Sequence, residues 1–168
     1  PLGSGMNYEV LALAIGPDGS LYAGGSFTTA GGAPANHIAR WDGATSSWHA
    51  LDSGTNGSVY ALALGPDGSL YVAGYFATAG GIAANSIARW DGTAWYPLGS
   101  GLAAYGHVST LAVDSDGSLY AGGTFTTVGG VAANSIASWD GATWHALGSG
   151  LNDEVKALAF GRDGSLYA

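Results

Sequence analysis

The sequence predicts an all-β protein built from repeated four-stranded units. One sequence segment occurs three times in full and a fourth time in part. Its equivalent aspartates, Asp18, Asp67, Asp116 and Asp163, are spaced 49, 49 and 47 residues apart. A fixed period in this range indicates a repeat architecture. Glycine and proline make up 35 of the 168 residues, whereas Lys, Arg and Glu together number six, too few to cover exposed helices.

The second copy shows the expected order of elements. Val59–Leu64 is a continuous apolar run of strand length, typical of a strand buried on both faces. It ends at Asp67-Gly68, where Asp-Gly supplies the positive φ that a hairpin turn needs. A second strand is expected over Ser69–Phe76, followed by a long loop over Ala77–Asn85.

A third strand, Ser86–Trp90, ends at a second hairpin signal, Asp91-Gly92, and a fourth follows over Ala94–Leu98. Four strands per copy with two hairpin turns describe one blade of a β-propeller. A solenoid fits less well, because leucine-rich and hexapeptide coils have shorter periods and lack paired Asp-Gly hairpins. The chain should contain about three and a half antiparallel blades.

The repeats divide the chain into five parts. Residues 1–9 contain a link and, before it, a segment with two interpretations. Pro1–Ser4 repeats Pro97–Ser100, as the end of a preceding fourth strand would, but it could also be a remnant of tag removal. Blades with their links then occupy 10–58, 59–107 and 108–154, and the inner two strands of an incomplete blade occupy 155–168. The chain has the pattern of a fragment of a longer repeat protein.

Composition excludes several classes of protein. A hydrophobic fraction of 47% is too high for a disordered chain. The longest aliphatic runs are near the length of Val10–Ile15, far short of a membrane span. A net charge of −8 and a pI near 4.4 argue against nucleic acid and anionic lipid as partners. With no cysteine there is neither a disulfide nor a thiolate metal site, and no cofactor is expected.

Recurrent residues carry a resemblance to a known family. Glycine pairs close the second strand in two copies (Gly24-Gly25 and Gly122-Gly123), which suggests close approach of another backbone. Together with two tryptophans per copy and the wording LYAGG…FTTAGG…IARWDG…W…LGSG, they resemble kelch-like propeller repeats of bacterial surface and secreted proteins. The pattern is also similar to the ectodomains of fungal cortical polarity markers. Its Pro-Asp-Gly turns are closer to NHL-like blades. The resemblance implies an extracellular or cell-surface location.

The recurrent aspartates have two interpretations. Each precedes a glycine, so turn formation is the favoured role for Asp18, Asp67, Asp116 and Asp163. Calcium needs six to eight oxygen ligands, and only Asp114 with Asp116 places two carboxylates in one turn. Those two residues are a weak candidate metal site.

The tryptophans could stack on sugars, but their recurrence at equivalent strand positions favours packing between blades. The six are Trp41, Trp48, Trp90, Trp95, Trp139 and Trp144.

Residues that differ between copies gather in the links and long loops of one rim, where a rigid scaffold usually carries its binding residues. Tyr8, Tyr105 and His107 are the candidate ligand-binding residues there. No nucleophile–base pair is recognisable, and the histidines lack metal-ligand spacing.

We therefore expect a non-catalytic scaffold or interaction module, with a carbohydrate-binding propeller as the alternative and a propeller enzyme as a remote one. An open arc of blades would expose apolar surface at each end, more than soluble monomers usually tolerate. The expected assembly is a two-fold homodimer that closes one ring, with strand exchange at 155–168 as a further option. A single-chain ring of four positions is the rival. A glycan or a protein is the expected ligand.

Overall fold

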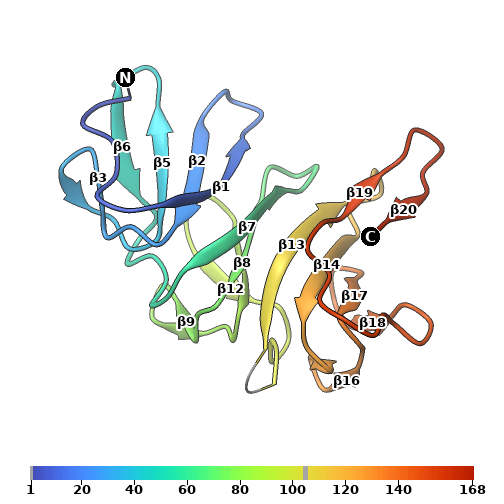
Figure 1. Ribbon diagram of the computed structural model, residues 1–168. Coiled ribbons are helices and arrows are strands. Elements are labelled where there is room, and N and C mark those ends of the chain that lie inside the picture. Colours follow the sequence, from blue (N-terminus) through green and yellow to red (C-terminus); the bar gives the residue numbers. More distant parts are fainter. Residues whose placement is uncertain (1, 104–105) are drawn as a thin grey trace.

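The computed structural model describes residues 2–103 and 106–168. Within them lie three four-stranded antiparallel sheets, which follow one another along the chain, and four two-stranded sheets, the last of which follows the third four-stranded sheet (Figure 1). The described residues contain no helix, and so none that is long and apolar enough to cross a membrane. We call the four-stranded sheets blades 1 to 3 and the last two-stranded sheet the half-blade.

Each blade has the same strand order, in which the first strand is innermost and the fourth outermost. Blade 1 comprises β1 (Val10–Ile15), β2 (Leu21–Gly25), β5 (Ile38–Asp42) and β6 (Ser47–Ala50). Blade 2 comprises β7 (Val59–Leu64), β8 (Leu70–Gly74), β11 (Ile87–Trp90) and β12 (Trp95–Pro97). Blade 3 comprises β13 (His107–Val113), β14 (Leu119–Thr124), β17 (Ile136–Trp139) and β18 (Trp144–Ala146). The half-blade comprises β19 (Ala159–Phe160) and β20 (Leu166–Tyr167).

The expected long loop in each blade is instead a short hairpin. In blade 2, β9 (Thr78–Ala79) pairs with β10 (Ile82–Ala83) through Gly80-Gly81, whose φ values of 57° and 78° suit a primed two-residue turn. Blades 1 and 3 repeat it as β3 (Thr29–Ala30) with β4 (Ala33–Pro34) and β15 (Thr127–Val128) with β16 (Val131–Ala132). The prediction missed these hairpins because each arm has only two paired residues, too few for a recognisable alternation of apolar and polar residues.

The glycine at the end of each second strand lies against backbone of its own blade. A Cβ on Gly25 would overlap the carbonyl oxygen of Glu9, and one on Gly123 would overlap that of His107. In both blades the register shifts at this point, between Val10 and Ala12 in blade 1. The predicted close backbone approach is confirmed for the second glycine of each pair.

The first glycine of each pair makes room for the next blade. A Cβ on Gly24 would lie 2.5 Å from Val59 Cγ1, and one on Gly122 would lie 2.5 Å from Val155 Cγ1. Adjacent inner strands lie side by side, β1 beside β7 and β7 beside β13. Blade-to-blade packing thus buries Val59 completely, and the same glycine–valine contact recurs between blade 3 and the half-blade.

The half-blade continues the same packing with fewer paired residues. Only Ala159 and Phe160 pair with Leu166 and Tyr167, although two strands were expected over the whole of 155–168. Val155 N donates to the Gly123 carbonyl at 3.2 Å, and Val155 is buried. This hairpin is therefore attached to blade 3 through the start of its first segment.

Candidate functional site

The two described candidates for ligand binding, Tyr8 and His107, lie in different parts of the structure. Tyr8 lies in the link before blade 1 and is 66% exposed. His107 begins β13, two blades away, and is partly buried. Tyr105 lies outside the described residues.

His107 belongs to a small cluster that joins blade 3 to the half-blade link. Its Nε2 lies 3.2 Å from Glu154 Oε1, and Ser109 donates its hydroxyl to the same oxygen at 2.7 Å. The Ser109 hydrogen bond, followed by that of His107, holds the pKa of Glu154 below its usual value. Because the serine donates to the carboxylate and not to the imidazole, the cluster lacks the serine–histidine hydrogen bond of a catalytic triad.

The recurrent aspartates bind the backbone of their own turns. Asp18 Oδ1 accepts from Ser20 N at 3.0 Å and Oδ2 accepts from Ser20 Oγ at 2.8 Å, and Arg40 lies 3.3 Å from the same carboxylate. The backbone hydrogen bond from Ser20 is the main reason why the pKa of Asp18 is lowered. Asp67, Asp116 and Asp163 each accept from the backbone N–H two residues later.

Of the two weak metal candidates, Asp114 bonds to Ser115 and Asp116 bonds to Ser118. The described residues contain no group of three or more His, Cys, Asp or Glu side chains placed to hold an ion.

The tryptophans pair across neighbouring strands, and one tryptophan in each blade is hydrogen-bonded to the preceding copy of the repeat. Within each blade the third- and fourth-strand rings lie 5.3 to 5.4 Å apart, as Trp41–Trp48, Trp90–Trp95 and Trp139–Trp144. The fourth-strand indole donates to a leucine carbonyl in the preceding copy, in the pairs Trp48–Leu2, Trp95–Leu51 and Trp144–Leu98. Leu2 therefore makes the same contact to blade 1 that Leu51 makes to blade 2.

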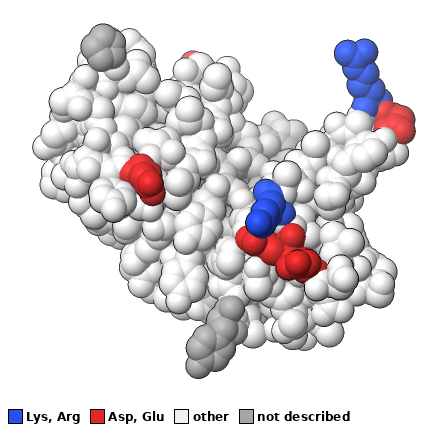
Figure 2. All heavy atoms as spheres, viewed as in Figure 1, with Lys and Arg blue, Asp and Glu red and all other residues white. Residues whose placement is uncertain are grey.

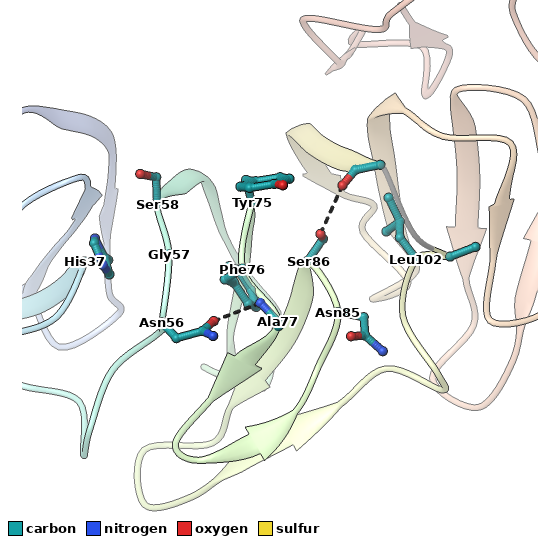
Figure 3. A pocket seen from close by; sticks show the side chains of 12 residues that line it. His37, Asn56, Gly57, Ser58, Tyr75, Phe76, Ala77, Asn85, Ser86 and Leu102 are labelled. Atoms are coloured by element: carbon teal, nitrogen blue, oxygen red, sulfur yellow. Dashed lines mark hydrogen bonds between the residues drawn. The ribbon is translucent and has the colours of Figure 1, made fainter.

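A cavity of about 640 Å³ lies at the loop end of blade 2, bordered by parts of blades 1 and 3 (Figure 3). His37 marks the blade 1 side and Leu102 the blade 3 side, with side chains of blade 2 and its link between them. The described lining residues are His37, Asn56, Gly57, Ser58, Tyr75, Phe76, Ala77, Asn85, Ser86, Leu102, Ala103 and Gly106. No Asp, Glu, Lys or Arg is among them.

The cavity wall is rigidly held by side-chain-to-backbone hydrogen bonds. Asn56 Oδ1 accepts from Ala77 N at 2.8 Å and from Thr78 N at 2.9 Å. Asn85 Nδ2 donates to the Ser100 carbonyl at 2.9 Å. A Cβ on Gly57 would overlap the Tyr75 carbonyl oxygen, so the link before blade 2 lies directly against the end of β8. Asn7 in blade 1 repeats the arrangement of Asn56.

Two lining residues depart from the repeat pattern. The position of Tyr75 carries Ser26 in blade 1 and Thr124 in blade 3, and the Tyr75 side chain is 62% exposed.

The position of His37 carries Ser86 in blade 2 and Ser135 in blade 3, and all three adopt a positive φ, between 61° and 73°. Burial lowers the pKa of His37, which favours the neutral ring. The sequence held this signal, because both residues break an otherwise regular pattern, but only the fold shows that they line the same cavity.

A neighbouring cavity of about 390 Å³ at blade 3 differs in charge. Its wall includes Asp153 and Glu154, which occupy the positions of Gly57 and Ser58 in the repeat. The link before blade 2 has small, uncharged residues at these positions, and the cavity at blade 2 is larger than the one at blade 3 and has no charged residue among its described lining residues.

Comparison with known proteins settles the fold. Residues 16–41, 65–90 and 115–137 match the sequence model of a β-propeller family described as a domain of unknown function (DUF5122). The fold is a β-propeller. The three matched segments each run from the first turn of a blade into its third strand, so the predicted all-β fold of four-stranded blades is confirmed.

Solved structures agree with this assignment. The extracellular domain of a putative one-component system from B. thetaiotaomicron is similar at a TM-score of 0.63 and 15% identity, over 94% of this chain and 19% of that one. A chain of a mitotic checkpoint complex is similar at a TM-score of 0.65 and 18% identity, over 96% of this chain and 46% of that one. This propeller thus spans less than half the length of either. No curated protein matches it in sequence.

Proposed function

We propose that this propeller is a non-catalytic interaction scaffold whose ring is completed by a second copy of the chain. The observation that carries the proposal is the uncovered first face of blade 1. Val10 is 41% exposed, whereas its counterparts Val59 and Val108 are fully buried and Val155 is 3% exposed. Leu13 and Ile15, on the same strand, are 60% and 72% exposed.

The other end of the arc carries the matching face. Tyr167 in β20 is 59% exposed, whereas Tyr71, its counterpart in blade 2, is 8% exposed. At the junction between blade 3 and the half-blade, Tyr120 lies edge-on to Phe160 with ring centroids 5.3 Å apart. Because Ile15 occupies the position of Phe160 in the repeat, Tyr167 of one copy would meet Ile15 of the next in the same way.

The contacts between neighbouring blades within one chain therefore indicate how the half-blade of one copy would pack against blade 1 of the next. Head-to-tail contacts of this kind form a closed ring when the rotation between subunits completes a circle. Charged side chains are sparse on the face drawn in Figure 2, where they gather in a few small groups. A ring of two arcs would contain two identical contacts, and a C2 axis would coincide with the propeller axis. Strand exchange is a variant of the same assembly, since β20 pairs with β19 on only one edge.

Three further parts of the proposal rest on other observations. The non-catalytic role is supported by the direction of the Ser109 hydrogen bond, which goes to Glu154 and not to His107, so no serine–histidine pair forms there. A kelch-like subfamily remains an expectation drawn from the tryptophan and glycine positions. An extracellular location is proposed on the same resemblance, and one similar structure is an extracellular domain.

Light scattering in solution tests ring closure. We expect a mass near twice 16.7 kDa at micromolar concentration. Leu13→Asp places a charge in the proposed contact without touching the interior of the chain, and this variant should have the mass of one chain. Ile82→Asp is the matched control, because Ile82 is 37% exposed on the β10 hairpin, away from both ends of the arc. A wild-type mass near 16.7 kDa with a cooperative melt would contradict the proposal.

A further inference from the structure

We propose that the cavity at the loop end of blade 2 is a binding site for a neutral saccharide. The site is formed by blades 1 to 3 of a single chain, so this inference is independent of ring closure. Its volume of about 640 Å³ lies within the range of roughly 300–1,000 Å³ that is typical of small-molecule sites.

Charge is the first argument for this class of ligand. The chain carries a net charge of −8, yet none of the described lining residues is an Asp, Glu, Lys or Arg. A charged ligand that entered the cavity would lose water without gaining a counter-charge, which is costly. The neighbouring cavity at blade 3, with Asp153 and Glu154 in its wall, lacks this property.

The polar groups in the wall suit a hydroxyl. Asn56 uses its carbonyl oxygen for the backbone of Ala77 and Thr78, which leaves the Nδ2 hydrogens as donors. Asn85 uses Nδ2 for the Ser100 carbonyl, which leaves its Oδ1 as an acceptor. A sugar hydroxyl both donates and accepts, so it can pair with one group of each kind.

Tyr75 supplies the apolar part of the site. Its ring is 62% exposed at the cavity, where it is available to the C–H face of a pyranose ring. The other large apolar lining residues, Phe76 and Leu102, are 6% and 5% exposed, so they offer little surface to the apolar side chain of a peptide. Peptide partners are usually anchored by such side chains in apolar pockets, and the cavity therefore favours a saccharide over a peptide.

Departures from the repeat converge on this cavity. Tyr75 replaces the serine or threonine of its sister blades, His37 replaces a serine, and Gly57-Ser58 replaces bulkier pairs such as Asp153-Glu154. Substitutions at three separate positions of the repeat thus meet around one space. The blade framework does not need them, because the sister blades form the same strands without them.

Saturation-transfer-difference NMR on the full chain tests the inference with methyl β-D-glucopyranoside, methyl β-D-galactopyranoside and methyl α-D-mannopyranoside. At least one should bind at millimolar concentration, and sodium glucuronate should bind more weakly than methyl β-D-glucopyranoside. Tyr75→Ser gives blade 2 the residue of blade 1 and should weaken binding about tenfold, as expected for the loss of an aromatic contact. Asn56→Asp keeps the oxygen that accepts from Ala77 and Thr78, removes the donor and adds a charge, and should also weaken binding.

Two matched variants control for general effects. Tyr8→Ser removes another exposed tyrosine, and Asn7→Asp changes the equivalent asparagine of blade 1; both should bind as the wild type does. Leu13→Asp should bind equally well, which separates this inference from ring closure. Failure of all three glycosides to bind overturns the inference, as does binding that survives Tyr75→Ser or preferential binding of a neutral peptide.

Discussion

The hydrogen bond from a tryptophan indole to a leucine carbonyl of the preceding copy occurs three times. The three bonds are not equally buried, so removing the indole donor should cost different amounts of stability. Trp144 is 4% exposed, and its Nε1 lies 3.0 Å from the Leu98 carbonyl oxygen, which is also buried. Trp144→Phe removes the donor and leaves that carbonyl unpaired, at a cost of about 1–3 kcal/mol. The smaller ring adds roughly 1 kcal/mol through incomplete filling of its site. We expect a total loss of about 2–4 kcal/mol in the free energy of unfolding.

Trp48→Phe is the internal comparison. Trp48 makes the same bond to Leu2 at 3.1 Å, but it is only partly buried and Leu2 is 43% exposed. Water can replace the lost donor there, so the cost should be about 0.5–1.5 kcal/mol. Urea unfolding followed by circular dichroism, at one fixed protein concentration, gives both values. A loss for Trp48→Phe that equals or exceeds that for Trp144→Phe would refute the reasoning.

Two further predictions concern the glycine pairs and the turns. Gly123→Ala should destabilise the fold by about 1–3 kcal/mol, because its Cβ would overlap the His107 carbonyl; Gly43→Ala, with no atom within 4 Å of the added carbon, should be neutral or slightly stabilising in the same urea assay. Asp140 accepts hydrogen bonds from the backbone of its own turn, at Ala142 N and Thr143 N. The pKa of Asp140, lowered mainly by its hydrogen bond to His145, and the pKa of Asp18 both lie below the ordinary 3.8. Their stabilising contribution is therefore present above pH 3.8 and is lost as the pH falls through the lowered values. Melting temperatures should drop on acidification below pH 3.8, and the drop should be smaller in Asp140→Asn; an acid-independent melt would contradict the turn role.

The regular part of this structure could be predicted because it is local and repeated. Val59–Leu64 was expected as a strand and is β7, residue for residue. The third and fourth strands were expected over Ser86–Trp90 and Ala94–Leu98 and are slightly shorter, as β11 and β12. Periodic apolar residues and Asp-Gly turns determine such elements, and three copies of the pattern reinforce one another.

The candidate site could not be predicted, because it depends on contacts between distant segments. His37 and Tyr75 are 38 positions apart in the chain and line one cavity only through the stacking of blades. Each was visible in the sequence as a departure from the repeat, but a departure alone does not separate drift from function. Tyr8 and His107, two of the candidate ligand-binding residues, lie apart because their links belong to blades that are not adjacent.

The most direct test of ring closure asks whether the two exposed ends of the arc meet in trans. The chain has no cysteine, so Ile15→Cys and Tyr167→Cys can be prepared as separate single-cysteine proteins, mixed, and treated with a short bismaleimide. A head-to-tail ring predicts a covalent dimer in the mixture and none in either protein alone. A covalent dimer from Ile15→Cys alone, or no covalent dimer in the mixture, would contradict the account.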